Sequence, residues 1–318
     1  MRFIESHLDR VTVDGLRWGV EPICRVLTEY GTPIAPSTYY EHKTAPAVAA
    51  RAVRAEREDR LDAAVARVHA ANYDAYGARK VWLQLRREGI DVARCSVETS
   101  MRRQQLQGLR RGKAKRTTIP DPQAARPGDL VGRQFNPTAP DRLWVADFTY
   151  VSTWSGWVYV AFVIDAYARR ILGWRCSTSM TTPLVLDAIE QAIWTRGREG
   201  ITDLTGLVHH NDRGSQYTSI AFTERLLDAG IDASVGATGS SYDNALAETI
   251  NGLYKTELIR PRGPWRTLEQ VEIATLEWVD WFNHRRIAQH CDDLTPVEFE
   301  QAHYRQNEAR QTAEHSHV

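Results

Sequence analysis

The sequence predicts an all-α half followed by an α/β half with a mixed central sheet. Apolar residues recur at helical spacing before residue 117, whereas β-branched and aromatic residues form short strand-like runs after residue 140. Five of the 13 prolines lie within 117–140, and such a segment is typical of an extended linker between domains. The chain of 318 residues has room for two or three domains.

Short helices are predicted near the amino terminus. Val20, Ile23 and Leu27 share one face of a helix over 20–30 that stops at Gly31. Pro36 then begins a second short helix. We expect these helices to form a small segment over residues 1–50.

The next helices predict a helix-turn-helix region. A helix over 57–71 precedes one over 76–89, which turns Val81, Trp82 and Leu85 inward and stops at Gly89. A third helix over 96–105 places Val97 and Met101 one turn apart. Two helices around a short turn are typical of a DNA-binding helix-turn-helix.

The net charge of zero hides two halves of opposite sign. Residues 1–140 carry 24 basic and 16 acidic side chains, and residues 141–318 carry 16 and 24. No acidic residue interrupts the basic run between Glu98 and Asp121, so this run could neutralise several phosphates. A solvated helix end leading into a linker is the alternative. The run consists of Arg102, Arg103, Arg110, Arg111, Lys113, Lys115 and Arg116.

The α/β half begins with three strands over 143–153, 156–166 and 170–177, separated by short breaks that predict antiparallel pairing. Helices and strands then alternate, which predicts a mixed sheet. They are a helix over 183–195, a strand over 207–211, a helix over 219–229, a strand over 231–235 and a helix over 243–258. In a last helix over 268–285, Trp278, Trp281 and Phe282 are predicted to form a core stripe.

Three carboxylates in this half are candidates for chemistry. Asp147 lies in the middle of a strand, where a carboxylate among apolar neighbours needs a partner or a cation. Asp212 follows a strand and begins an Asp-Arg-Gly-Ser turn, and Glu248 lies on the long helix. On that helix Asn244, Glu248, Asn251 and Lys255 share one face.

The ligand types favour a hard divalent cation. Carboxylates suit Mg²⁺ or Mn²⁺, and the four cysteines are too far apart to suggest a zinc site or a disulfide framework. Paired cations of this kind support in-line displacement at phosphorus. Alternation along the strand over 207–211 should send one of His209 and His210 inward as a structural residue and the other outward. The outward one would contact DNA or support a residue of the site.

Three motifs resemble those of the catalytic second-frame protein of bacterial insertion-sequence transposases, which has a retroviral-integrase core. They are Tyr76-Gly77-Ala78-Arg79-Lys80, Tyr242-Asp243-Asn244-Ala245-Leu246-Ala247-Glu248 and Trp281-Phe282-Asn283-His284-Arg285-Arg286. The resemblance implies a ribonuclease-H-like core with Asp147, Asp212 and Glu248 as a metal-binding catalytic triad for Mg²⁺ or Mn²⁺. It also implies cleavage at the element ends followed by strand transfer.

The resemblance further implies that DNA is the partner, as element ends and as target. A homo-oligomer on DNA and an upstream-frame protein, as a fusion or a partner, are expected with it. Predicted DNA contacts are Lys255, Asn244, Asn251, Arg79, Lys80, Arg102, Arg103, Arg110, Arg111, Lys113, Lys115 and Arg116. Asn244 and Asn251 could instead serve their own helix, and Lys255 could be an ordinary surface lysine.

Three places depart from the family pattern. Ser100 replaces a large apolar residue, Asp74 stands where glycine is usual, and 288–293 replaces a more apolar stretch. The expected domains are a helical segment over 1–50, a helix-turn-helix domain over 51–116, a linker over 117–140, a catalytic core over 141–262 and a helical region over 263–318.

We expect a cytoplasmic protein, because the start shows no signal peptide and the longest apolar run is too short for a membrane helix. Two functions compete with an active transposase. One is a catalytically inactive DNA-binding regulator of transposition. The other is a ribonuclease H or a junction-resolving nuclease, which the helix-turn-helix half disfavours.

Overall fold

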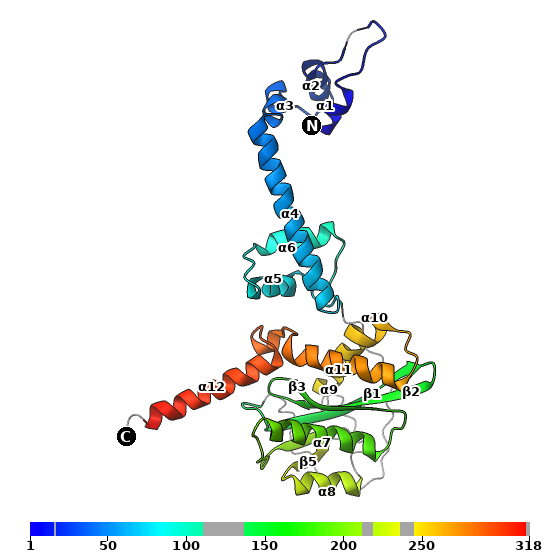
Figure 1. The fold of residues 1–318 in the computed structure, drawn as a ribbon, viewed down its shortest axis with the longest axis vertical. Helices are drawn as coiled ribbons and strands as arrows, with labels where there is room; N and C mark the ends of the chain where they lie inside the picture. Colours follow the sequence, from blue (N-terminus) through cyan, green and yellow to red (C-terminus); the bar gives the residue numbers. More distant parts are fainter. Residues whose placement is uncertain (16, 111–136, 212–218, 236–244, 316–318) are drawn as a thin grey trace. The chain divides into compact units, whose positions relative to one another are not determined.

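A computed structural model describes residues 1–15, 17–110, 137–211, 219–235 and 245–315 (Figure 1). These form two compact units: Met1–Val68 with Asp91–Leu106, and His69–Ile90 with Gln107–Val318. Among the described helices, none combines the length and apolar character that crossing a membrane requires.

The first unit contains a small core built by three short helices. Helices α1 (Arg2–His7), α2 (Val20–Glu29) and α3 (Pro36–His42) bury Ile4, Ile23 and Tyr39 against one another. Gly31 follows α2 at a φ of +80°, a conformation that glycine adopts without steric cost. The predicted helical pair and its glycine stop are therefore confirmed.

A polar cluster joins α6 (Arg94–Arg103) to α4 (Ala45–Ala71). Ser100 Oγ donates a hydrogen bond to Asp62 Oδ1 at 2.5 Å, and Arg103 donates to both oxygens of the same carboxylate at 2.7 and 2.6 Å. These hydrogen bonds lower the pKa of Asp62 below its ordinary value. The unusual Ser100 is thus accommodated by the Asp62 carboxylate of α4. A large apolar residue at position 100 would displace this cluster.

Helix α5 (Ala78–Arg87) belongs to the second unit. Val81 and Leu85 are buried as predicted, and Gly89 ends the helix at a φ of +79°. Trp82 is partly buried, and the Arg86 guanidinium lies over its ring. Asp74, at the unusual glycine position, has a φ of +52°, which explains why glycine suits this turn.

Five strands form one mixed sheet in the order β3-β2-β1-β4-β5 (Figure 1). Strands β1 (Leu143–Thr153), β2 (Gly156–Asp165) and β3 (Arg170–Ser177) pair antiparallel. Strands β4 (Val208–Asn211) and β5 (Asp232–Val235) continue the sheet in parallel from β1. The predicted strands and the mixed sheet are confirmed.

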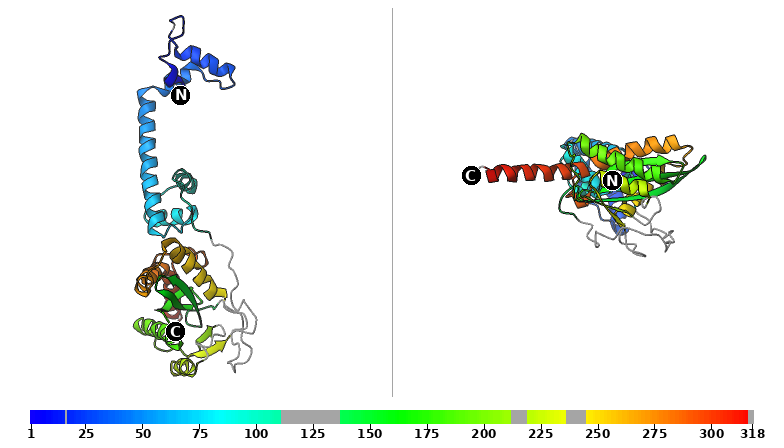
Figure 2. Two further views of the ribbon diagram at one scale, coloured as in Figure 1. Left: turned by 90° about the vertical axis from the view of Figure 1, so that its right-hand side faces the viewer. Right: turned by 90° about the horizontal axis from the view of Figure 1, so that it is seen from below.

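Helices cover both faces of the sheet (Figure 2). Helices α7 (Thr182–Arg198) and α8 (Ile220–Asp228) pack on one face, where the apolar core includes Trp144 and Phe222. A Cβ at Gly173 of β3 would lie 2.0 Å from the Ala188 carbonyl oxygen, so only glycine permits the observed approach of α7.

The opposite face carries α9 (Ala245–Tyr254) and α11 (Leu268–His284). Tyr254, Trp278 and Phe162 of β2 form an edge-to-face aromatic cluster with ring centroids 5.2 to 6.2 Å apart. Trp278, Trp281 and Phe282 are buried, which confirms the predicted core stripe. The π-helix η1 (Lys255–Ile259), α10 (Arg260–Arg262) and the 3₁₀ turn η2 (Gln289–Cys291) complete this region.

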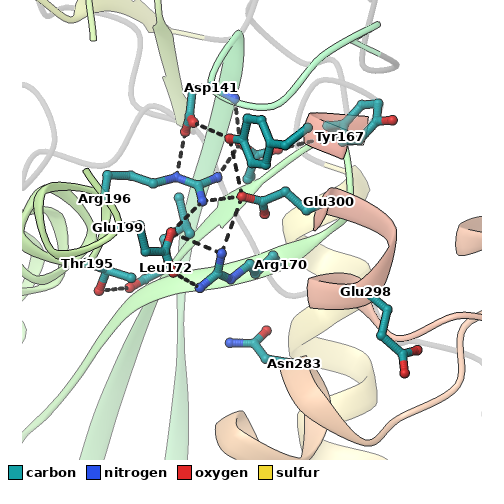
Figure 3. Close-up of polar contacts among 12 residues, drawn as sticks. Asp141, Tyr167, Arg170, Leu172, Thr195, Arg196, Glu199, Asn283, Glu298 and Glu300 are labelled. Atoms are coloured by element: carbon teal, nitrogen blue, oxygen red, sulfur yellow. Dashed lines mark hydrogen bonds and ion pairs between the residues drawn. The ribbon is translucent and has the colours of Figure 1, made fainter. Parts of the chain in front are cut away.

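The last helix, α12 (Pro296–His315), carries Glu300 into a buried network around Arg196 of α7 (Figure 3). Arg196 has no exposed surface and donates to Asp141 at 2.8 Å, Asp165 at 3.2 Å and Glu300. Burial by itself lowers the pKa of Arg196, but these three carboxylates raise it further than burial lowers it. Burial in turn raises the pKa of Asp165. The network thus joins segments more than 100 residues apart in the sequence.

Replacing Arg196 tests how far the fold depends on this network. Arg196→Met leaves several buried carboxylates without their cation, so we expect it to lower the free energy of unfolding by about 3–5 kcal/mol. Urea unfolding followed by tryptophan fluorescence measures the change. The exposed Arg198→Met on the same helix is the matched control and should stay within about 0.5 kcal/mol of the parent. Equal effects of the two substitutions would contradict the prediction.

Candidate active site

Asp147 lies in the middle of β1, and two hydrogen bonds orient its carboxylate. The Phe148 backbone N–H donates to Oδ1 at 2.8 Å, and Asn251 Nδ2 donates to Oδ2 at 2.9 Å. The first donor comes from the same strand and the second from α9. The Asn251 amide therefore ties the helix that carries Glu248 to the strand that carries Asp147.

Helix α9 presents two kinds of side chain at this point. Asn251 and Tyr254 are buried, and the Tyr254 hydroxyl hydrogen-bonds Thr275 Oγ1 at 2.7 Å. Glu248 lies in the first turn, three residues before Asn251, and is exposed. A spacing of three residues places both on one side of the helix. Asp147 is held in one orientation, whereas Glu248 is exposed. Such a combination of carboxylates is suited to bind a cation that also contacts a substrate.

Two predicted site residues, Asp212 and Asn244, lie outside the described residues. The last described residue of β4 is Asn211, which pairs with Ala146, the residue directly before Asp147. The carboxyl end of β4 therefore lies level with the Asp147 segment of β1. Parallel strands bring successive site residues to one edge of a sheet in this way.

The polar atoms around Asp147 fit a hydrated hard cation. Within the described part of the chain, the buried amide oxygens of Asn211 and Asn251 accept no hydrogen bond. Buried oxygens of this kind normally have a partner, and bound water or a hard metal would provide one. The described residues alone contain no set of three histidine, cysteine, aspartate or glutamate side chains that could hold a metal.

Lys255 follows α9 at the start of the π-helix, a rare conformation that is frequent at functional sites. Its Nζ lies 4.6 Å from the ring centroid of Tyr150 on β1. Burial, followed by the charge of Arg260, lowers the pKa of Lys255, whereas the charge of Asp147 raises it. The Lys255 ammonium group thus interacts electrostatically with the Asp147 carboxylate.

His209 and His210 are both fully buried, so the prediction that one of them faces outward is wrong. The His209 ring packs edge-on against Phe222 of α8 at 5.4 Å, and His210 Nδ1 lies 2.9 Å from Ser234 Oγ. The alternation rule failed because helices cover both faces of this inner strand. Burial lowers the pKa of His209 to about 3.

Several predicted DNA-contacting cations are engaged within their own unit. Arg79 forms a two-pronged pair with Asp293 at 2.8 and 2.5 Å, which gives the unusual 288–293 segment a role in docking α5. Lys80 is largely buried, and burial lowers its pKa to about 8. Arg102 and Arg110 are exposed. Arg111, Lys113, Lys115 and Arg116 lie outside the described residues.

Three arginines that follow α9 and η1 were not predicted as functional residues. Arg260 is exposed, and Arg262 and Arg266 lie over the rings of Tyr73 and Trp154 at 4.2 and 5.0 Å. The signal was present in the sequence as three arginines within seven residues after the long helix. The net negative charge of residues 141–318 hides this local cluster of positive charge.

The sequence matches an HTH-like domain over residues 56–114 and an integrase core domain over residues 137–241 and 229–296. It is 65% identical over 277 residues to the "Putative transposase for insertion sequence element IS986/IS6110" of Mycobacterium tuberculosis (strain ATCC 25618 / H37Rv). That alignment covers 87% of this chain and 98% of the relative. This chain belongs to the insertion-sequence transposases with an integrase core.

A second transposase, that of insertion sequence element IS629 from Shigella sonnei, is 52% identical over 297 residues, covering 92% of this chain and 95% of the relative. Among solved structures, the HTLV-2 integrase catalytic core domain in complex with magnesium matches at 18% identity and a TM-score of 0.39. It covers 51% of this chain and 98% of that one. The integrase core match and the 65% identical relative, by themselves, identify the transposase as a member of the DDE polynucleotidyl transferase family and confirm the predicted family. The predicted fold class is confirmed by the mixed sheet and the HTH-like match.

Asn251 should act as a positioning residue for Asp147. Asn251→Leu removes the amide that holds Oδ2, so we expect end cleavage to slow by about 10- to 100-fold and the Mg²⁺ concentration for half-maximal rate to rise. A Mg²⁺ titration of the cleavage rate measures both effects. Thr249→Ala, on the same helix, is the control. If Asn251→Leu has the same cleavage rate and the same Mg²⁺ dependence as Thr249→Ala, Asn251 does not position Asp147 for the reaction.

The buried His209 makes stability depend on pH. The unfolded chain protonates this imidazole below about pH 6.5, whereas the folded protein keeps it neutral down to about pH 3. The contribution of the neutral His209 to the free energy of unfolding is therefore fully present above pH 6.5. It is lost as the pH falls from there toward pH 3, at up to about 1.4 kcal/mol per pH unit. Urea unfolding at pH 7, 6 and 5 should show a shallower decline for His209→Leu than for the parent.

The exposed His284→Leu variant is the control for that series. It should reproduce the pH dependence of the parent. If His209→Leu also reproduces it, His209 is not the group responsible.

Proposed function

We propose that this transposase cleaves DNA at the ends of its element and joins the freed strand to a second DNA site. Asp147, Asp212 and Glu248 would hold Mg²⁺ or Mn²⁺ for both steps. The observation that carries the proposal is the 2.9 Å hydrogen bond from Asn251 to Asp147, which binds the Glu248 helix to the Asp147 strand. The 65% identical transposase, matched over nearly its full length, supports the same chemistry.

Both steps are displacements at phosphorus. In the first, a water oxygen forms a bond to the phosphorus at the element end, the bond to the 3′-oxygen breaks, and a 3′-hydroxyl is released. In the second, that hydroxyl attacks a phosphodiester of another strand, forms a new linkage and releases that strand's 3′-hydroxyl. One phosphodiester is formed for each one broken in the second step, so no nucleotide cofactor is needed. When bound, the divalent cations supply activation of the attacking oxygen and charge stabilisation at the phosphate.

The protein's own residues prepare the site for these steps. Asn251 fixes the orientation of Asp147, and Glu248 is exposed on the same helix as Asn251. Lys255 is placed to bind a phosphate oxygen, since its ammonium keeps three donors above the Tyr150 ring. We also propose Asn244 as a contact near the cleaved end.

We further propose that the basic run from Arg102 to Arg116 binds DNA phosphates. Arg102 and Arg110 are exposed, and the proposal extends to Arg111, Lys113, Lys115 and Arg116. Arg79, Lys80 and Arg103 would contact DNA only by giving up their present contacts, and we rank them below Arg102 and Arg110. The proposed domains remain 51–116 for DNA binding and 141–262 for catalysis.

Single substitutions in the triad test this proposal. On labelled DNA carrying the element ends, Asp147→Asn, Asp212→Asn and Glu248→Gln should each lower Mg²⁺-dependent cleavage and joining at least about 100-fold while end binding persists. Asp228→Asn, exposed at the end of α8, is the matched control and should remain active. The measurement is the yield of cleaved and joined strands on denaturing gels.

Other outcomes identify the competing functions. A parent protein that binds the ends but never cleaves them with Mg²⁺ or Mn²⁺ would be a DNA-binding regulator. Preferential cleavage of RNA:DNA hybrids or of branched junctions would indicate a different nuclease.

A further inference from the structure

Three large aromatic side chains are exposed at the outer end of the β1–β2 hairpin. Tyr150, Trp154 and Trp157 are 44%, 67% and 53% exposed. In the described ladders, β4 pairs only with residues 143–146 of β1, and β3 pairs only with residues 159–165 of β2. The outer part of the hairpin therefore has no neighbouring described strand. Exposed aromatic groups of this size usually mark a binding surface.

Two cations accompany these rings. Lys255 Nζ lies 4.6 Å from the Tyr150 ring centroid, and the Arg266 guanidinium lies 5.0 Å from that of Trp154. Tyr150 and Trp157 meet edge to face at 5.2 Å. We call Tyr150, Trp154, Trp157, Lys255 and Arg266 the aromatic platform. A cation stacked on a ring keeps its charge and can still bind an anion.

The backbone holds the aromatic platform in place. Trp154 N–H donates to the Trp265 carbonyl at 3.0 Å, and Ser155 donates to the Arg266 carbonyl from both its N–H and its hydroxyl, at 3.2 and 3.1 Å. Trp265 is buried and donates its ring N–H to the Ile259 carbonyl at 2.9 Å. The exposed rings are thus presented by a braced turn, which lowers the entropy cost of binding.

The aromatic platform lies close to the candidate active site along β1. Tyr150 follows Asp147 by three residues, which corresponds to about 10 Å along the strand and places the two side chains on opposite faces of it. Lys255 links the two, because it lies over Tyr150 and is close enough to Asp147 for that charge to raise its pKa. About three nucleotide steps of a stacked strand span the same length.

We propose that the aromatic platform stacks unpaired bases of the DNA strand within about three nucleotides of the cleaved phosphodiester. This inference rests on the proposed function, since it places the scissile phosphate at Asp147. Rings of Tyr and Trp stack on any base, and the flanking Lys255 and Arg266 suit the phosphates between them. A surface for duplex DNA alone would need the cations but not the exposed rings, because bases in a duplex are already stacked.

The test compares two probes with the full chain in the absence of divalent metal. One probe is a blunt duplex, and the other is the same duplex with a three-nucleotide unpaired extension containing 2-aminopurine. The parent should bind the extended probe about tenfold more tightly and quench 2-aminopurine by stacking. Trp154→Ala with Trp157→Ala should abolish both the preference and the quenching. Tyr150→Phe should keep them, whereas Tyr150→Ala should weaken them.

Trp194→Ala is the matched control, because Trp194 is an equally exposed tryptophan (62%) with Arg198 5.3 Å above its ring, but on α7. It should retain the preference of the parent. The inference is overturned if the double variant behaves like this control, or if the parent binds both probes equally. It is also overturned if the double variant changes only the oligomeric state, which would identify a protein contact.

Asp147→Asn separates this inference from the proposed function. The variant should keep the preference for the extended probe while losing cleavage. If the parent does not cleave DNA, the proposed function is contradicted. The binding comparison then still tests whether the aromatic platform stacks unpaired bases.

Discussion

The buried guanidinium of Arg196 is the constraint on which the α/β unit depends. A fully buried cation is tolerated only when carboxylates surround it. Here Asp141 and Glu300 (Figure 3), together with Asp165, come from three separate segments of the sequence. Asp141 precedes β1 and Asp165 ends β2, so pairing both with one side chain fixes the inner end of the hairpin. In that register Trp144 lies opposite Asp165, and Asp147 follows three residues later. The network thereby sets where the candidate catalytic carboxylate lies in the sheet.

The second requirement for the site is met on the opposite face of the sheet. The Tyr254, Trp278 and Phe162 rings hold α9 against the strands, and this packing brings the Asn251 amide to Asp147. Apolar packing thus sets the position of the helix, and one hydrogen bond sets the orientation of the carboxylate. Because Glu248 and Lys255 lie on either side of Asn251 along the chain, the same packing determines where the exposed carboxylate and the ammonium group lie.

Periodicity predicted most of the fold, because β-branched runs and helical stripes report burial directly. It gave the bounds of β1 and β3 to the residue and the buried stripe of α11. Helix α12 had no such signal, since its sequence is mostly polar and its docking depends on the buried ion pair of Glu300. His209 and His210 were misplaced because alternation along a strand does not reveal that both faces are covered. Spacing and residue type suggested Asp147, Glu248 and Lys255, but not the hydrogen bond from Asn251 that positions Asp147.

Charge by halves of the chain is a poor guide to where DNA can bind. In the basic half, Arg103 pairs with Asp62 and Arg79 pairs with Asp293, and a cation held by a carboxylate inside the protein neutralises little phosphate charge. In the acidic half, Lys255, Arg262 and Arg266 lie over aromatic rings, and no ion pair joins them to a carboxylate among the described residues. Rings leave the charge of these cations available, whereas carboxylates neutralise it. Among the described residues, Lys255 thus brings positive charge close to Asp147 from the half with the acidic total, where a phosphate must approach carboxylates that would otherwise repel it.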